Sequence, residues 1–516
     1  MTLGTDSQIA LPGSVTDPSH LYQALAGDRP YTALLESGDG TEGQPGLSLL
    51  LERSALRIRI QGRATEVVAL TSFGRQVCQR VAEHSLLQGF VTDRTSERIR
   101  VRHPNPDPLL EDRERLMEPS PFDVLRAVQR SIEGVAVDQI LLVAVLHFGL
   151  IVAFEDIPGM DPSDARAEVL LAERFVRIDH AQRRTEVVDL NSGPRKLQER
   201  VSEFLDIEVQ RGDKAIGTFV DLVGDVSVDL DDDAFAQVVE RCQQEIKQGE
   251  VFQVVPSRSF RLPCRDTFAA YQHLRRLNPS PYQFFLRSES EVLFGASPET
   301  CVKIVPSAKG SELTLRPIAG TRSRGRNAHG ELVPDLDNRL SAELVLDAKE
   351  QSEHMMLVDL ARNDVARVCQ PGSRHVTRLL ALEHYSHVSH LVSEVQGRLA
   401  TDLDAFHAYQ ACMNMGTLTG APKLRATELI AELEATPRGP YGGAVGYVLG
   451  NGDEKTTFDS AIVIRSAQVV DGVATVRAGA GVVRDSNPQL EAQETRRKAE
   501  AVLVALAAAT QREART

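Results

Sequence analysis

Short apolar runs separated by turn residues fill the first part of the chain, and they limit the folds that it can adopt. Over residues 21–225 these runs include LSLLLERSALRIRIQG and VLLAERFVRID. Short apolar runs that alternate with turns in this way favour strands in a mixed sheet. The longest run, ILLVAVLHFGLIVAF at 140–154, is interrupted by His147 and Gly149. Because a membrane span needs ~20 apolar residues, we expect two buried strands there instead.

The chain changes character at the acidic segment DLDDDAF, residues 229–235. Aspartates there could cap a helix, because their side chains accept hydrogen bonds from the first N–H groups. The apolar residues that follow have helical spacing and end at Gly249. We therefore predict a loose leader at 1–20, an N-terminal domain at 21–225 and a second domain at 230–512.

Composition excludes some classes of partner. The 516-residue chain has a formal net charge of -14, which argues against the basic face that nucleic acids and anionic membranes require. Its six cysteines form no C-x-x-C pair, so we expect reduced thiols and a cytoplasmic protein. The length fits two domains or one large intertwined α/β body.

Two pairs of glutamates each lie one helical turn apart. Glu350 and Glu353 occur in EQSEHMMLVDLARND, and Glu491 and Glu494 occur in EAQETRRKAEAVLVAL. Either pair alone is most simply a solvated helix face with local ion pairs. Together, however, oxygen ligands from two helices could hold Mg²⁺ and leave water positions for a substrate carboxylate.

Three further stretches could contribute to a site. Glu299 in GASPET follows a predicted strand, where a turn could present it as a general acid, although an exposed turn glutamate is the simpler interpretation. The AGAG segment at 478–481 could offer backbone N–H groups to an anion. His390 in HVSHL, taken alone, is more typical of a core histidine.

Nine motifs follow one another in a recognisable order. They are FQVVPSR, NPSPYQFF, FGASPET, RPIAGTRSRG, EHMMLVDLARND, GTLTGAPK, GPYGGAVGY, TFDSAIVIRS and GAGVVRDSNPQLEAQET. Together they resemble the chorismate-utilising enzymes, and more closely the component I family of the anthranilate synthases. The resemblance implies an α+β fold in which two β-sheets pack on each other, with helices outside and the active site in the cleft between the sheets.

The resemblance also implies roles for individual residues. Glu299 would protonate the departing ring hydroxyl while ammonia adds, and His390, titrating near neutrality, would assist the elimination of pyruvate. Thr417 would shape the pocket. The family's Mg²⁺ ligands match Glu350, Glu353, Glu491 and Glu494, of which Glu353 and Glu494 are the principal candidates. Its contacts with chorismate match Gly320, Thr321, Tyr441, Arg465, Gly479, Ala480, Gly481 and Lys498.

Two positions distinguish the reactions within this family. Enzymes that add water carry a catalytic lysine where this chain has Gln253, and aminodeoxychorismate synthases typically carry lysine where it has Ala319. We therefore expect ammonia itself to attack the ring, which gives anthranilate, the precursor of tryptophan. The alternatives are an aminodeoxychorismate synthase component I and, from another class, a non-catalytic regulatory subunit of the same fold.

The resemblance implies a partner and an effector. None of the cysteines has the flanking glycines of a glutaminase nucleophile, so we expect a separate glutamine amidotransferase, component II, in a hetero-oligomer such as a heterotetramer. Ser37 in LLES, with Pro281, Tyr282 and Gln283, resembles the family's L-tryptophan site and implies feedback inhibition. The simpler interpretation of Ser37 is that it caps a turn.

Overall fold

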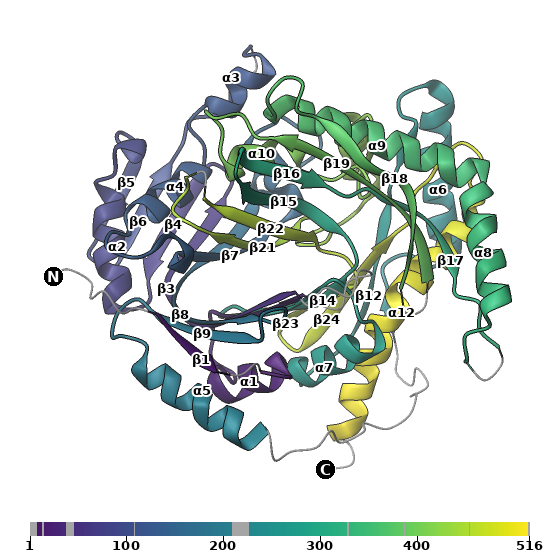
Figure 1. Cartoon of the computed structure of the whole chain (residues 1–516). Helices are drawn as coiled ribbons and strands as arrows, with labels where there is room; N and C mark the ends of the chain where they lie inside the picture. The colour runs from purple at the N-terminus through teal and green to yellow at the C-terminus, as the bar shows by residue number, and fades with distance from the viewer. Residues whose placement is uncertain are drawn as a thin grey trace.

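Two layers of antiparallel strands face each other in the computed structural model, with helices on the outside (Figure 1). The structure describes residues 8–513 except 13–14, 38–45, 108, 209–225, 328–329, 386–387 and 454. The predicted fold class is therefore confirmed, with one refinement: the two layers are joined. Strands β3 (Leu47–Gln61) and β8 (Arg166–Asp179) pair along their length and run through both layers. Their pairing shifts register around Arg53, and bulges of this kind bend strands at a corner.

The strand order follows from the pairings on either side of this corner. Beyond β3 and β8, the first layer contains β10 (Ser227–Val228), β12 (Ser257–Pro263), β24 (Val473–Gly479), β23 (Ser466–Val470), β14 (Glu291–Ser297), β13 (Tyr282–Arg287), β2 (Thr32–Ser37), β9 (Arg184–Asp189) and β1 (Gln8–Pro12).

The second layer contains β5 (Val91–Arg94), β6 (Arg98–Arg102), β4 (Ala64–Ala69), β7 (Leu141–Leu146), β21 (Ala444–Leu449), β22 (Thr457–Ile462), β15 (Thr300–Ser307), β16 (Gly310–Leu315), β19 (Val388–Arg398), β17 (Ile318–Ser323) and β18 (His375–His384). A separate two-stranded sheet joins β11 (Gln253–Val254) to β20 (Gly420–Ala421).

Helices cover the outer faces of both layers (Figure 1). The first layer and its flank carry α1 (Pro18–Leu25), α5 (Arg195–Glu208), α6 (Asp232–Gln248), α7 (Thr267–Leu277) and α12 (Pro488–Glu513). The remaining helices are α2 (Ser72–Ala82), α3 (Asp112–Met117), α4 (Phe122–Arg130), α8 (Pro334–Leu346), α9 (Ala348–Val368), α10 (Ala405–Cys412) and α11 (Lys423–Leu433). None of the helices in the described part of the chain has the length and apolar character needed to cross a membrane.

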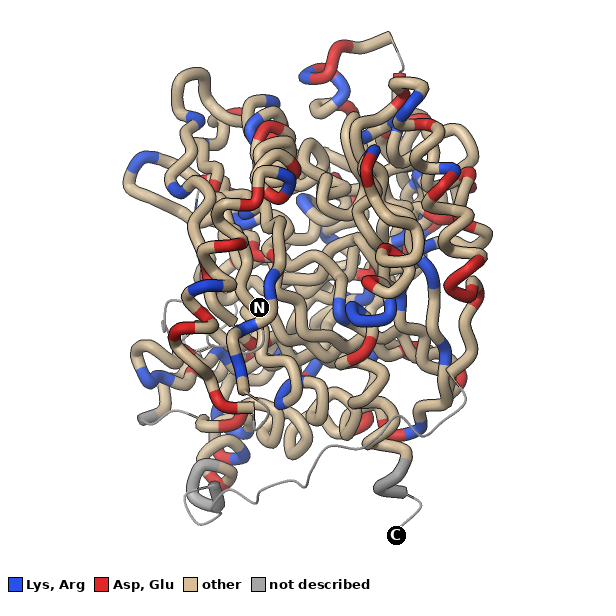
Figure 2. Tube along the Cα trace, turned by 90° about the vertical axis from the view of Figure 1, so that its right-hand side faces the viewer, with Lys and Arg blue, Asp and Glu red and all other residues tan. Residues whose placement is uncertain are grey.

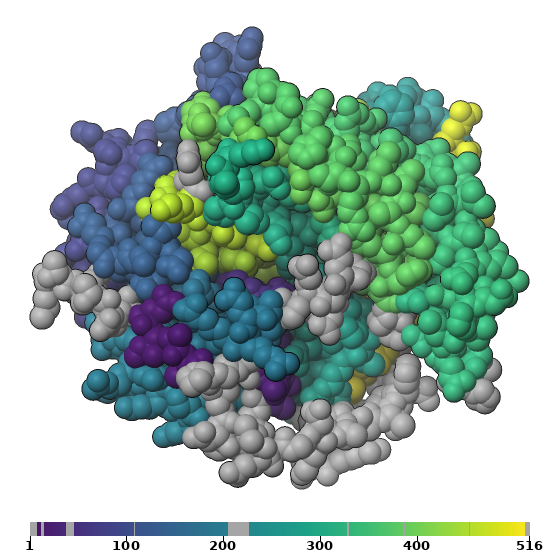
Figure 3. Space-filling view, in the orientation of Figure 1, coloured from purple at the N-terminus to yellow at the C-terminus, as the bar shows by residue number. Residues whose placement is uncertain are grey.

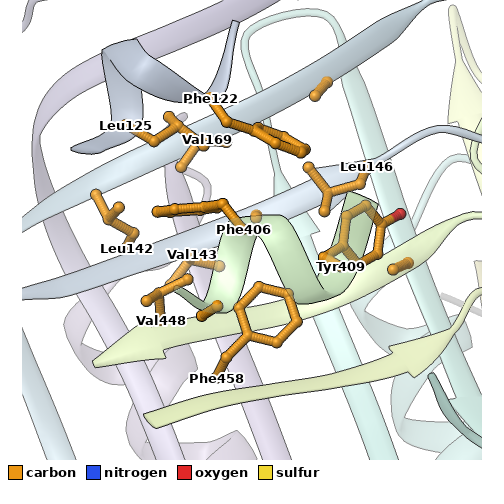
Figure 4. Close-up of a cluster of buried hydrophobic side chains, with 14 of the residues drawn as sticks. Phe122, Leu125, Leu142, Val143, Leu146, Val169, Phe406, Tyr409, Val448 and Phe458 are labelled. Atoms are coloured by element: carbon orange, nitrogen blue, oxygen red, sulfur yellow. The ribbon is translucent and has the colours of Figure 1, made fainter. Parts of the chain in front are cut away.

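Aromatic packing fixes α4 and α10 against the second layer. Phe122 of α4 lies 5.5 Å from Phe406 of α10, ring centre to ring centre, and Tyr409 lies 5.9 Å from Phe458 of β22. These rings pack on aliphatic side chains of β7 and β21, including Leu142 (Figure 4). Burial of such large side chains stabilises each by roughly 1.5–3 kcal/mol. This aromatic cluster therefore anchors α4 and α10 on the second layer.

Strands from both predicted domains alternate in this architecture. β2 pairs with β13 in the first layer, and β7 pairs with β21 in the second. The described parts of 21–225 and 230–512 therefore share one sheet, as an intertwined α/β body requires. Within the expected leader, 1–20, the strand β1 pairs with β9, and α1 begins at Pro18.

Local patterns predict some elements correctly and one wrongly. The predicted helix after residue 229 is α6: Asp231 caps it by accepting from the Ala234 N–H, and Gly249 ends it at a φ of 86°. The expectation of two strands at 140–154 is wrong in its second half. β7 ends at Leu146, and a 3-10 helix runs over Phe148–Ala153. Glycine is required at position 149 of this helix, because a Cβ there would lie 2.4 Å from the Asp164 carbonyl oxygen.

The structure shows where the charged residues and the cysteines lie. Acidic and basic residues are interspersed along the trace (Figure 2). All six cysteines are buried free thiols.

Candidate active site

Glu299 lies between β14 and β15, and its backbone is fixed because its carbonyl accepts a hydrogen bond from Ile462 N at 3.0 Å. The residue is 7% exposed. Burial raises the pKa of its carboxyl to about 7, although the Thr417 hydroxyl and the charges of Lys498 and Arg465 act in the opposite direction. A carboxylic acid with this pKa keeps about half of its protons at neutral pH and could donate one, which is the role predicted for Glu299.

Thr417 lies beside this acid, as its predicted role requires. Its hydroxyl is buried and makes no hydrogen bond of regular geometry with the described residues. It is nevertheless close enough to Glu299 to influence the pKa of the carboxyl. A buried hydroxyl without a regular partner is costly, and such groups are characteristic of sites that bind a ligand.

His390 lies on β19 opposite Thr321 of β17. Its Nδ1 is 3.2 Å from the Gly320 carbonyl oxygen and 3.0 Å from Thr321 Oγ1. A carbonyl oxygen can only accept, so Nδ1 carries the proton and Nε2 is left as the acceptor. Burial lowers the pKa of His390 to about 4, so the expectation that it titrates near neutrality is wrong. The imidazole is neutral at physiological pH, and its Nε2 lone pair is the one that could accept a proton.

Gly320 makes this arrangement possible. It has a φ of 75°, in the left-handed region, at a register shift between β17 and β19. A Cβ there would lie 3.1 Å from Leu344 Cδ1 and 3.2 Å from Glu350 Oε2. The glycine thus turns its carbonyl toward His390 and lets α9 approach the strand.

Two cations face the acid. Arg465 lies in the turn between β22 and β23 with a φ of 50°, a strained backbone for a non-glycine residue. Its guanidinium makes no hydrogen bond or ion pair with the residues that the structure describes, but it acts electrostatically on both Glu299 and His390. Lys498 Nζ donates to the Gly479 carbonyl at 3.0 Å. An unpaired guanidinium beside a lysine suits an anionic ligand.

The predicted glycine-rich turn forms a wall of the same site. A Cβ on Gly479 would lie 3.0 Å from the Tyr441 hydroxyl, and one on Gly481 would lie 2.9 Å from Gln253 Nε2. The Gln253 side chain is therefore in the site, where its Oε1 is buried without a hydrogen bond to a described residue. The Ala480 N–H, in contrast, donates to the Pro256 carbonyl at 3.2 Å and is not available to an anion.

Helices α9 and α12 carry the predicted metal ligands. α9 packs on β17 and β19, and α12 packs on β24 and β12 (Figure 1). Burial raises the pKa of Glu353; Lys349 acts in the opposite direction, and the charges of Glu350 and Glu491 add to the increase. The carboxylates of the two helices therefore repel one another across the site.

Basic side chains neutralise three of these carboxylates. The ion pairs are Arg322–Glu350 at 3.1 Å, Lys349–Glu353 at 3.6 Å and Lys498–Glu494 at 2.7 Å. Among the described residues, no three acidic, histidine or cysteine side chains lie together as a ready metal site. The donor chemistry still fits Mg²⁺, which prefers carboxylate oxygens, and Glu353 Oε1 is buried without a hydrogen bond. Binding would require the carboxylates to exchange their lysine partners for the ion.

The predicted effector residues meet at a different place. Ser37 of β2 pairs with Tyr282 of β13, and both line a pocket of about 30 Å³ together with Gln283 and residues of β21 and β22. Pro281 immediately precedes this strand. The surface is hollowed between β21–β22 and the first layer (Figure 3). Ser37 Oγ donates to the Leu47 carbonyl at 2.9 Å, so Ser37 also ties β2 to β3.

The sequence interpretation missed two residues that touch the site. Arg322 holds Glu350 and also donates to Asp347 Oδ2 at 2.8 Å, which anchors the start of α9. Tyr385 meets the His390 ring edge-on, with ring centres 5.3 Å apart. Arg322 stands within the motif RPIAGTRSRG, which could have indicated it. No sequence pattern marks Tyr385, because its approach to His390 depends on the pairing of β18 with β19.

Comparison with known proteins places this site in a family. The family model described as chorismate binding enzyme matches residues 84–504, more than half of the chain, and the chain belongs to this family. It is 44% identical over 501 residues to anthranilate synthase component 1 of Escherichia coli, covering 96% of this chain and 95% of that protein. It is 45% identical over 472 residues to the pyocyanine-specific anthranilate synthase component 1 of Pseudomonas aeruginosa, covering 90% and 87%.

Solved structures agree with the sequence comparison. Anthranilate synthase component I of Streptococcus pneumoniae superimposes with a TM-score of 0.66 at 28% identity and covers 89% of this chain and 92% of that one. The menaquinone-specific isochorismate synthase of Escherichia coli superimposes with a TM-score of 0.62 at 18% identity, covering 97% and 94%, which shows the shared fold alone.

Proposed function

We propose that this chain is the chorismate-binding subunit of an anthranilate synthase, which converts chorismate and ammonia to anthranilate, pyruvate and water. The observation that carries the proposal is the surroundings of Glu299: a buried carboxyl with a pKa of about 7 faces two cations. Such a site can bind a dicarboxylate and protonate a hydroxyl that leaves it.

The residues divide the reaction between them. Arg465 and Lys498 bind the carboxylates of chorismate, and Glu299 gives its proton to the ring hydroxyl, which departs as water when ammonia adds. Nε2 of His390 then accepts the ring proton as the enolpyruvyl group leaves, while the Gly320 carbonyl holds the opposite ring nitrogen. Gln253 and Ala319 offer no amine, so ammonia is the nucleophile in preference to water or a lysine.

Mg²⁺ is proposed as the metal, with Glu353 and Glu494 as principal ligands and Glu350 and Glu491 as supporting ones. It would supply positive charge against the ring carboxylate and so favour addition to the ring. Burial and carboxylate repulsion at Glu353 support this proposal, because a cation would relieve both. The relevant measurement is Mg²⁺ affinity by calorimetry, which we expect Glu353→Gln and Glu494→Gln to weaken.

Ammonia is proposed to come from glutamine through a separate amidotransferase, component II, in a hetero-oligomer. The six buried cysteines support this division, because a glutaminase nucleophile must reach its substrate. We also propose that L-tryptophan binds at Ser37, Pro281, Tyr282 and Gln283 and inhibits the enzyme. Ser37→Phe should relieve that inhibition with little change in turnover, since its pocket lies outside the catalytic site.

The direct test incubates the purified chain with chorismate, Mg²⁺ and an ammonium salt and follows anthranilate fluorescence. We expect product with ammonia and none with glutamine, while Glu299→Gln serves as the inactive control. A para-aminated product would support the aminodeoxychorismate alternative, and complete absence of turnover would support a regulatory subunit. Product from glutamine with the pure chain would contradict the proposed division of labour.

A further inference from the structure

β15 begins with an irregularity directly beside the catalytic acid. Its pairing with β22 shifts register between Thr300 and Lys303. The Ser460 hydroxyl accepts from Val302 N at 3.2 Å and donates to the Val302 carbonyl at 2.9 Å, so it satisfies the backbone groups at the irregularity. Bulges are enriched next to active sites because they re-aim a side chain. Here the residue before the irregular segment is Glu299.

Thr300 is held by a directed chain of hydrogen bonds. The Tyr282 hydroxyl donates to Asp459 Oδ1 at 2.9 Å and lies 3.1 Å from Thr300 Oγ1. Because a phenol has one proton and gives it to the carboxylate, the Thr300 hydroxyl must donate to the Tyr282 oxygen. Lys303 Nζ lies 3.4 Å from Asp459 Oδ2 and supports the carboxylate from β15. The direction of the two hydrogen bonds is therefore set by the Asp459 carboxylate, which Lys303 holds in place.

From this geometry we propose that Thr300, Tyr282 and Asp459 form a positioning cluster for Glu299. The proposal rests on the proposed function, in which Glu299 is the acid. Ile462 N fixes the Glu299 carbonyl from β22, and the cluster fixes the following residue through its side chain. The acid is thus held from both sides at the point where the strand is irregular.

The cluster also spans two regions of the molecule. Tyr282 and Asp459 line the pocket beside Ser37, whereas Thr300 is not part of its wall. Thr300 therefore connects the wall of that pocket to the catalytic acid through a single hydrogen bond and one peptide unit.

The experiment compares three changes by steady-state kinetics with chorismate and ammonia. Thr300→Val removes the hydroxyl at nearly constant volume, and we expect kcat to fall about tenfold with little change in KM, as for loss of one buried hydrogen bond that positions a reacting group. Thr300→Ser keeps the hydroxyl and should restore most of kcat. Thr314→Val on β16 makes the same chemical change at a threonine whose side chain forms no hydrogen bond with the described residues, and it should leave kcat unchanged.

Two further measurements distinguish a role of Thr300 in positioning Glu299 from a role in the stability of the protein. In Thr300→Val the alkaline limb of the pH profile of kcat should move from near 7 toward lower pH, because a misplaced carboxyl is less well shielded from water. Tyr282→Phe should reduce kcat similarly, and the double variant should be no worse than either single one, since both remove the same bond.

The outcomes distinguish the inference from the function on which it rests. Failure of the wild-type chain to make anthranilate refutes the proposed function before any variant is compared. If the wild type is active but Thr300→Val equals Thr300→Ser in kcat and pH profile, the positioning cluster is refuted. Should Thr300→Val unfold, Tyr282→Phe decides instead: wild-type kcat and pH profile there overturn the proposal, and the expected loss supports it.

Discussion

Glu299 and Glu434 are both buried glutamates, but their surroundings differ completely. At Glu434 burial alone would raise the pKa of the carboxyl, but Arg438 and Arg477 outweigh it and the pKa is lowered. Arg438 Nη2 donates to Glu434 Oε1 at 2.6 Å, and Arg477 Nη2 donates to Oε2 at 2.9 Å. The Ser257 hydroxyl also donates to Oε1. Glu299 has no ion pair within 4 Å among the described residues, and its pKa rises to about 7.

The difference teaches how one side chain serves two purposes. The Glu434 cluster lies behind the site, where Ser257 pairs with Gly479 of the substrate wall, and its charges satisfy one another. At Glu299 the polar groups keep unused bonding capacity: Gln253 Oε1 has no hydrogen-bond partner among the described residues, and the Thr417 hydroxyl has none of regular geometry. Buried charges that are paired with one another, as at Glu434, stabilise the fold. Buried polar groups with free hydrogen-bonding capacity, as near Glu299, are available to bind a ligand.

The largest effect should come from removing the carboxyl of Glu299, the proposed acid. Glu299→Gln keeps the shape of the side chain but cannot give up a proton, so we expect kcat to fall roughly 10²–10⁴-fold. The melting temperature at pH 8 should not decrease, because the variant removes a carboxyl that is costly to ionise when buried. Anthranilate fluorescence and thermal unfolding measure the two quantities. A variant with wild-type kcat would assign the acid elsewhere.

The matched change at the paired glutamate should affect stability instead. Glu434→Gln leaves Arg438 and Arg477 buried without a counter-charge, and we expect a loss of about 3–5 kcal/mol in the free energy of unfolding. Denaturant unfolding measures it. The folded fraction should retain turnover, in contrast to Glu299→Gln. An unchanged free energy of unfolding would show that the two arginines find other partners.

The pH dependence of stability sharpens the comparison. Glu299 has a folded pKa of about 7, above its ordinary value of 4.5, so the folded state holds the proton more tightly than the unfolded state. Its contribution is therefore full below pH 4.5 and is lost as the pH rises to about 7, by at most ~3 kcal/mol. Denaturant unfolding of Glu299→Gln and wild type across this window should differ in slope. Parallel curves would contradict the raised pKa.

The smallest effect concerns Glu353, a half-buried carboxylate that is paired only loosely with the exposed Lys349. Lys349→Met removes the cation 3.6 Å from Glu353. Since an exposed ion pair is worth about 0.2–1 kcal/mol, Mg²⁺ affinity should increase a few-fold at most. Calorimetric titration with Mg²⁺ measures this, and Arg339→Met, whose partner Glu343 lies on α8, provides a control. Weaker binding in Lys349→Met would mean that the lysine helps to hold the metal site.

Local spacing predicted several elements well because it depends only on neighbours in the chain. The acidic cap and the glycine at the end of α6 are both where the pattern put them. Ala499 and Val502 of α12 are buried, and Glu494 on the same helix interacts electrostatically with Lys498 and Arg465. The family resemblance added the ordered motifs, and the structure brings Glu299, Thr417 and Arg465 together.

By itself, then, the sequence determined the family and the helices with their carboxylate pairs, and it predicted Glu299 as the acid and His390 as the second catalytic group. Tertiary structure alone decided how each group behaves. The sequence alone does not show that the pKa of Glu299 is raised and that of Glu434 lowered, because a pKa depends on burial and on charges brought from distant strands. The same reason applies to His390: burial lowers its pKa to about 4 although the Gly320 carbonyl acts in the opposite direction, and that carbonyl on a neighbouring strand sets the proton on Nδ1.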